Sequence, residues 1–202
     1  MLTKTQEQIL VFLLSHPEEK PTIRGIAKKL GKSYTLVYNN IADLEKKNII
    51  KKEPVPPAQI VTLNEFAPTP VFVDIELKRK KDLLQKYPWI QVMLEDIFIS
   101  AKNLFFILLV FGSYAKGLQT AKSDLDLLII VRDKKDIREI EDAMHKAYTK
   151  VKKAPNFIDT NDFREMILNP GALNIGNEAR KYHVILYGVE GYYQLLNGAY
   201  KR

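Results

Sequence analysis

Apolar positions in residues 1–50 recur three and four apart, and the runs are interrupted by residues that end helices. This spacing predicts amphipathic helices over residues 5–14, 22–30 and 34–47. Thr3 or Thr5, and Ser33, stand where N-caps are expected. Because Gly31 tolerates a tight break, the segment predicts three short helices with a turn before the last.

A β-hairpin is predicted directly after the third helix. The chain becomes apolar and basic after Asn48, reverses at a proline-rich tip over 54–57, and returns over 59–63. Farther on, prolines punctuate residues 64–73, which we expect to form an extended linker. Two helices are then expected, over 76–87 and 88–102.

The rest of the chain alternates apolar strands with helices. The expected elements are strands over 104–111, 125–131, 156–158 and 183–187, and a helix over 136–152. Together with the N-terminal helices, this pattern predicts an α+β fold class. The predicted organisation is an N-terminal helical domain with a hairpin over 1–65, a linker with helices over 66–102, and an α/β domain with a small mixed sheet over 103–202.

Composition narrows the class of protein. With 202 residues, 46% hydrophobic and 27% charged, the chain is ordinary for globular domains. It has no cysteine, which excludes disulfides and thiolate metal sites, and its three histidines lack ligand-like spacing. We expect no signal peptide and no membrane span, hence a cytoplasmic protein. The net charge of +7 permits a nucleic-acid partner without requiring one.

The candidate chemistry lies in residues 111–131. An apolar run ends at Gly112 and Ser113, where backbone and a hydroxyl can approach a phosphate. The next apolar run opens with Asp124 and Asp126, which are two apart and therefore share one face of a strand end. Two adjacent carboxylates need a cation to neutralise them, and their oxygen atoms are suitable ligands for Mg²⁺ or Mn²⁺. The expected substrate is a nucleoside triphosphate, with ATP as the first choice.

The string Gly112-Ser113-x-Ala115-x-Gly117, followed by Ser123-Asp124-x-Asp126-Leu127, resembles the signature of the DNA polymerase beta-like nucleotidyltransferases. It looks closest to the minimal nucleotidyltransferases of archaea and bacteria. The resemblance implies that Asp124 and Asp126 are catalytic and metal-binding, and that Gly112, Ser113 and Lys116 bind the nucleotide. Lys116 stands where many relatives carry Arg, so it keeps the charge but loses the bidentate fork.

Catalysis in such relatives usually needs a third carboxylate from a neighbouring strand. Here the corresponding position holds Asn156, which cannot act as a base. Asp159 is the nearest carboxylate, and it has two readings: the N-cap of the following helix or a displaced third ligand. The motif therefore predicts metal–nucleotide binding and leaves turnover in doubt.

The N-terminal pattern resembles a winged helix-turn-helix domain, whose third helix enters the major groove of duplex DNA. The residues expected to contact DNA are Lys32, Ser33, Tyr34, Thr35, Tyr38, Asn39, Lys51 and Lys52. Lys28 and Lys29 are further expected phosphate contacts. The alternative is a winged helix used only for protein contacts. Since palindromic sites favour paired regulators, a homodimer is expected.

Three functions follow from these two resemblances. The first is a DNA-binding transcriptional regulator whose second domain binds a metal–nucleotide. The second is an active nucleotidyltransferase that moves a nucleoside monophosphate to a protein, such as a toxin-like partner, or to a small molecule. The third is a pair of adaptor domains for protein assembly. Asn156 favours the first over the second, and the intact acidic pair argues against the third.

Overall fold

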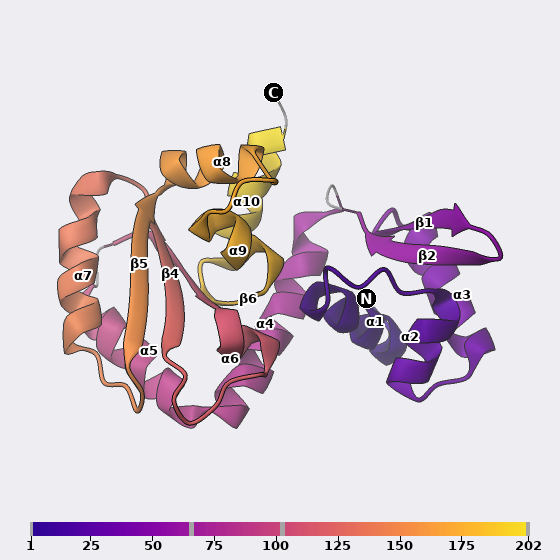
Figure 1. The fold of residues 1–202 in the computed structure, drawn as a ribbon, viewed down its shortest axis with the longest axis horizontal. Coiled ribbons are helices and arrows are strands. Elements are labelled where there is room, and N and C mark those ends of the chain that lie inside the picture. Colours follow the sequence, from indigo (N-terminus) through magenta and orange to yellow (C-terminus); the bar gives the residue numbers. More distant parts are fainter. Residues whose placement is uncertain (1, 65–66, 102–103, 201–202) are drawn as a thin grey trace. The chain divides into compact units, whose positions relative to one another are not determined.

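Three capped helices open the chain in the computed structural model, which describes residues 2–64, 67–101 and 104–200 (Figure 1). They are α1 (Lys4–Ser15), α2 (Ile23–Leu30) and α3 (Tyr34–Lys46), as predicted within a residue or two. The side chains of Thr3, Thr22 and Ser33 accept hydrogen bonds from the backbone of the first turns. Gly31 ends α2 in the left-handed conformation, as the sequence predicts.

The predicted hairpin follows as β1 (Ile50–Val55) and β2 (Ala58–Leu63), paired antiparallel. One face of each helix and the base of the hairpin share a hydrophobic core. Its fully buried members include Ile9, Ile26, Val37, Ile41, Leu44 and Val61. These elements form the three-helix-plus-hairpin arrangement of a winged helix.

The expected linker over 64–73 is largely wrong, because helix α4 (Thr69–Lys86) begins inside it. Pro70 lies in the first turn of α4, where a proline is tolerated since its missing N–H would have no helical partner. The prolines thus mark a helix start. Residues 65–66 of that predicted segment lie outside the described residues. The chain divides into two compact units, Met1–Ile75 and Glu76–Arg202, and the division falls within α4.

The second unit is built on a four-stranded mixed sheet with the order β5-β4-β3-β6. Its strands are β3 (Phe106–Phe111), β4 (Leu125–Val131), β5 (Lys153–Asp159) and β6 (His183–Tyr187). The β4–β5 pair is parallel, whereas β3 is antiparallel to both of its neighbours. The expectation of an α+β fold with a small mixed sheet is confirmed.

Helices cover both faces of this sheet (Figure 1). One face packs against α5 (Pro88–Ser100) and α7 (Ile137–Lys146). The other carries α8 (Thr160–Leu168), α9 (Ile175–Lys181) and α10 (Val189–Tyr200). Helix α7 is shorter than the predicted 136–152 and β5 is longer than 156–158. Because β4 and β5 are parallel, the chain must cross back over the sheet between them. Residues 147–152, predicted to be helical, form the connection from α7 to β5.

The helices of residues 2–64, 67–101 and 104–200 include none that is both long and apolar enough to cross a membrane.

Candidate functional site

The two halves of the sequence motif meet at the end of β3. Gly112 has φ +63°, and a Cβ built on it would lie 2.1 Å from Oδ2 of Asp126. The positive φ favours glycine, and a side chain at this position would have to displace the Asp126 carboxylate. Asp126 also accepts a hydrogen bond from the backbone N–H of Ser113. The turn into the short helix α6 (Gly112–Lys116) therefore packs directly on Asp126.

The electrostatics of Asp126 are unfavourable for its ionised form. Burial raises the pKa of this carboxyl, the negative charges of Glu178 and Asp124 raise it further, and the Ser113 hydrogen bond partly opposes them. Glu178, on α9, is a residue that sequence reasoning missed. It lies far along the chain with no motif of its own, so only the tertiary structure brings its charge to Asp126.

Asp124 lies one residue before β4 and has a partner of its own. Its Oδ2 is 3.1 Å from the Nζ of Lys152, whose side chain is 79% exposed. An ammonium this exposed contributes little stability and can move away at low cost. Asp124 therefore differs from Asp126, which receives a backbone N–H and two like charges.

The carboxylate pair suits a hard cation in its chemistry. Within the described parts of the chain, no group of three or more His, Cys, Asp or Glu side chains is placed to hold a metal ion. Mg²⁺ commonly uses one or two protein carboxylates and takes its remaining ligands from water and substrate phosphates. Asp124 and Asp126 fit that role, and a cation would relieve the repulsion recorded in the raised pKa of Asp126.

Lys116 closes the short helix α6 and is exposed to solvent. Its Nζ lies 4.8 Å from the centre of the Tyr182 ring, a cation–π arrangement. Tyr182 follows α9, the helix that carries Glu178. Lys116, which is expected to contact phosphate, thus lies over the ring of Tyr182, next to the helix that carries Glu178.

Asn156 and Asp159 occupy different ends of β5. Asn156 pairs with Leu128, on the same face as Asp126, and its amide donates to backbone carbonyls of Leu127 and Ala154. Asp159 pairs with Val131 at the far end of β4; at about 3.3 Å per residue, it lies about 16 Å along the strand from the position of Asp126.

Asp159 is the N-cap of α8, where it accepts from the backbone N–H groups of Asn161 and Asp162, both at 2.8 Å. The cap prediction is confirmed, and this placement rules out a displaced third metal ligand.

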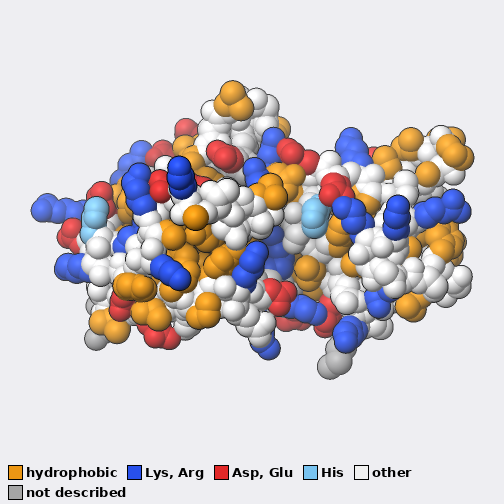
Figure 2. Space-filling view, turned by 60° about the horizontal axis from the view of Figure 1, so that its bottom comes forward, with side chains coloured by type: hydrophobic (Ala, Val, Ile, Leu, Met, Phe, Trp, Pro, Cys, Tyr) orange, Lys and Arg blue, Asp and Glu red, His pale blue; other side chains and the backbone are white. Residues whose placement is uncertain are grey.

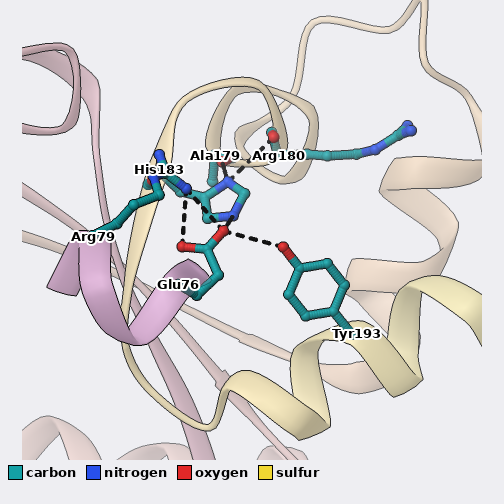
Figure 3. A network of polar contacts seen from close by, with 6 residues as sticks. All are labelled: Glu76, Arg79, Ala179, Arg180, His183 and Tyr193. Carbon is teal, nitrogen blue, oxygen red and sulfur yellow. Dashed lines mark hydrogen bonds and ion pairs between the residues drawn. The ribbon is translucent and has the colours of Figure 1, made fainter. Parts of the chain in front are cut away.

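A buried polar network (Figure 3) surrounds His183 at the start of β6, the strand that pairs with β3 on the side away from β4. Arg79 donates to both carboxylate oxygens of Glu76, at 2.8 and 2.9 Å, and to the backbone carbonyl of His183 at 2.6 Å. Tyr193 donates to the same carboxylate at 3.1 Å. Since His183 pairs with Phe111, the residue before Gly112, the network fixes the strand next to the Gly112 turn.

Burial lowers the pKa of His183, the nearby Glu76 opposes this, and Arg79 adds to it. The imidazole is therefore neutral near pH 7. Its Nδ1 lies 2.9 Å from the carbonyl oxygen of Ala179 and must carry the proton, because a carbonyl only accepts. This contact fastens β6 to α9, the helix of Glu178 (Figure 3).

In the first unit, α3 divides cleanly into a buried and an exposed face. Val37, Ile41 and Leu44 are fully buried, whereas Tyr34 and Tyr38 are 49% and 43% exposed. Thr35 and Asn39 are exposed beside them, and the two tyrosine rings stack with centroids 6.0 Å apart. The exposed face thus presents aromatic, hydroxyl and amide groups, which are the types that contact bases and sugar-phosphate.

The expected basic contacts of this unit differ in their surroundings. Lys52 lies 2.6 Å from Glu45 and its side chain is only 17% exposed, so its charge is already compensated. Lys51 is exposed and Lys32 is half-buried, next to the capping Ser33. On the face that Figure 2 presents, Lys and Arg side chains are scattered and do not gather in one patch.

The first unit has the arrangement of a winged helix-turn-helix domain, and it is fused to a nucleotidyltransferase domain in the second unit. Residues 107–183 match the family model described as "Nucleotidyltransferase domain". The matched stretch runs from β3 to the start of β6 and includes the Gly112 turn, the Asp124/Asp126 pair and Glu178. The predicted resemblance is confirmed for this domain.

The N-terminal region is similar to repressors. The LexA repressor of Listeria monocytogenes serotype 4a is 33% identical over 82 residues, which cover 38% of this chain and 40% of that protein. The LexA repressor of Syntrophomonas wolfei is 35% identical over 68 residues, 32% of this chain and 33% of that protein. The chain thus spans well under half the length of these relatives.

One solved structure also matches: MepR, a transcription regulator of the Staphylococcus aureus multidrug efflux pump MepA. It is 27% identical and has a TM-score of 0.30, over 31% of this chain and 47% of that one.

Proposed function

We propose that this protein is a DNA-binding transcriptional regulator whose nucleotidyltransferase domain binds a divalent cation, Mg²⁺ or Mn²⁺, with a nucleoside triphosphate. The observation that carries the nucleotide part is the contact of Gly112 with Asp126, which leaves room for no side chain. The fold places the carboxylate of Asp126 directly against the Gly112 turn, although its surroundings raise its pKa. Such an arrangement costs stability and is typical of a binding site.

Metal-dependent nucleotide binding is tested by thermal unfolding of the full chain. ATP should raise the melting temperature only in the presence of Mg²⁺ or Mn²⁺, because a ligand that binds the folded state alone stabilises it. GTP, CTP and UTP in parallel would identify the preferred base. A shift of equal size in EDTA, or none with any nucleotide, would contradict the proposal.

DNA binding is supported by the exposed Tyr34, Thr35, Tyr38 and Asn39 face of α3 and by the similarity to repressors. The full chain is the right material, since Ile75 from α4 packs in the core of the first unit. Removing the charges of Lys32 and Lys51 should weaken binding to all sequences and reduce its salt dependence, because both would neutralise phosphates.

Removing Lys52 alone, which lies 2.6 Å from Glu45, should weaken binding less than removing Lys32 alone. Replacing Tyr38 or Asn39 should change sequence preference instead. A chain with no affinity for genomic fragments at low salt would refute DNA binding, and a monomer on the bound fragment would refute the expected homodimer.

The alternative is an active transferase that moves a nucleoside monophosphate to a protein or small molecule. The intact Asp124/Asp126 pair favours it. Asn156 at the third position disfavours it, because its side-chain amide donates hydrogen bonds to backbone carbonyls and cannot act as a base. A missing base commonly lowers the rate by about 10²–10⁴-fold. Label transfer from α-labelled triphosphates into cell lysate or purified acceptor decides between binding and transfer.

A further inference from the structure

A cavity with a volume of about 460 Å³ opens in the C-terminal unit at the end of the sheet opposite Asp126. It lies where Ile107 of β3 pairs with Ile130 of β4, whereas the β3–β4 ladder reaches Leu127, next to Asp126, at its other end. Helices α8 and α10 supply the remaining walls. Its size falls in the range of small-molecule sites, about 300–1,000 Å³.

Two glycines of the Gly188-x-x-Gly191 sequence line the cavity. Gly188 has φ +80°, and a Cβ there would lie 2.9 Å from the carbonyl oxygen of Phe106. Gly191 is in the first turns of α10, and a Cβ there would reach 3.6 Å from Cδ1 of Ile107, an ordinary contact. Helix α10 thus begins close to β3, and Gly191, which has no side chain, leaves the apolar surface around Ile107 open to a ligand.

The rim of the cavity carries only positive charge. The charged side chains lining it are Arg132, just after β4, and Arg164 of α8, with no Asp or Glu among the lining residues. Both arginines are exposed, and neither forms an ion pair within residues 2–64, 67–101 and 104–200. Thr160 adds a hydroxyl between them, 3.4 Å from the carbonyl oxygen of Arg132.

Aromatic surface stands beside this charge. The side chain of Phe105 is 80% exposed and that of Tyr187 is 40% exposed, and both line the cavity. Phe105 and Tyr187 line this cavity together with Ile107, and a contiguous exposed apolar surface, unlike a single exposed side chain, often marks a binding site. Aromatic faces stack on planar ligands, while guanidinium groups bind carboxylate, phosphate or sulfonate in a bidentate manner.

From these features, we infer a second ligand site that binds a small molecule with an aromatic or branched apolar body and one anionic head group. The body lies on Phe105, Ile107 and Tyr187, and the head group lies between Arg132 and Arg164. The inference does not rest on the nucleotide site, because the cavity shares no residue with it and needs no metal.

The probe for this test is 8-anilinonaphthalene-1-sulfonate, which has an aromatic body and one sulfonate, titrated by fluorescence into the full chain in EDTA. The double variant Arg132→Gln/Arg164→Gln should weaken its binding at least about tenfold, since two charge-assisted contacts are lost. Arg138→Gln, an exposed arginine on α7 outside the cavity, is the matched control and should change nothing. The uncharged N-phenyl-1-naphthylamine should bind parent and double variant equally.

A second variant addresses the apolar floor. Gly191→Leu places a side chain in the hollow at a helical position without backbone strain, and should remove binding of both dyes while the melting temperature is kept. In ¹H–¹⁵N spectra, the dye should shift the Gly188 and Gly191 amides and leave the Gly112 amide unmoved. Absence of dye binding to the parent, or binding unaffected by both the double variant and Gly191→Leu, would overturn the inference.

Discussion

Two clusters of charged residues lie close to the paired residues Phe111 and His183: one around Glu76 and one around Asp126. The two carboxylates have opposite electrostatic surroundings. Glu76 is completely buried, yet Arg79 and Tyr193 bind its oxygens, so its charge is compensated (Figure 3). Asp126 is only half-buried, but it faces Glu178 and Asp124, and its pKa is raised. Removing one partner of a compensated buried pair leaves an unpaired buried charge and destabilises the fold, whereas an uncompensated carboxylate at a surface turn is available to a ligand.

The largest effect should come from Glu76→Gln. The amide keeps the shape but leaves the buried Arg79 guanidinium without its counter-ion, which costs about 3–5 kcal/mol of unfolding free energy. Urea unfolding of the full chain measures it, with the exposed Glu141→Gln of α7 as control. If Glu76→Gln unfolds at the same urea concentration as the parent, the Glu76–Arg79 contact does not contribute to the stability of the fold.

Gly112→Ala should come next, costing about 1–3 kcal/mol and removing nucleotide binding. Its control is Gly117→Ala, because Gly117 also has positive φ (+70°) but a Cβ there meets nothing within 4 Å. Gly117→Ala therefore introduces backbone strain alone, whereas Gly112→Ala introduces the same kind of strain and a clash with Asp126. Equal nucleotide-induced melting shifts in both variants would show that the Gly112–Asp126 contact does not matter for binding.

The buried His183 predicts a pH effect of intermediate size. Its pKa is lowered in the folded state, so below about pH 6.5 the unfolded chain binds more protons than the folded one. Stability should therefore be full above that pH and should fall on acidification, by at most about 1.4 kcal/mol per pH unit. Urea unfolding between pH 7.5 and 5.5 should show this slope in the parent and a flatter one in His183→Gln.

Asp126→Asn should leave the unfolding free energy unchanged or raised, because it removes a carboxylate repelled by its neighbours. The Mg²⁺-dependent melting shift with ATP should disappear, since the amide is a weaker metal ligand. Asp142→Asn, on the exposed side of α7, controls for charge. A preserved shift in Asp126→Asn would remove Asp126 from the proposed metal site.

The smallest effect is expected for Asp159→Asn. Asn caps helices about as well as Asp, so stability should change by only a few tenths of a kcal/mol. Nucleotide binding and any label transfer should be untouched, because this cap lies at the far end of β5 from Asp126. Loss of transfer in this variant would restore Asp159 as a functional carboxylate.

Much of the local structure is encoded in short stretches of sequence. The caps Thr3 and Ser33, the Gly31 break, and the hairpin after α3 lie where the residues predict them, because each depends on neighbours a few positions away. The errors fall where local signals are ambiguous. Prolines at the start of α4 look like a linker, and the end of α7 depends on where β5 joins the sheet.

Amino-acid order alone predicts the two domain types, the capped helices, and the Gly112-Ser113 and Asp124/Asp126 motif, because these features follow from spacing along one strand or one helix. The charge environment of each site, in contrast, follows from the folded arrangement of the chain. This arrangement brings Glu178 to Asp126, Glu76 and Arg79 to His183, and Arg132 and Arg164 to one cavity. These residues are distant in the chain, and a pattern in sequence carries no information about which distant side chains the sheet order will place together.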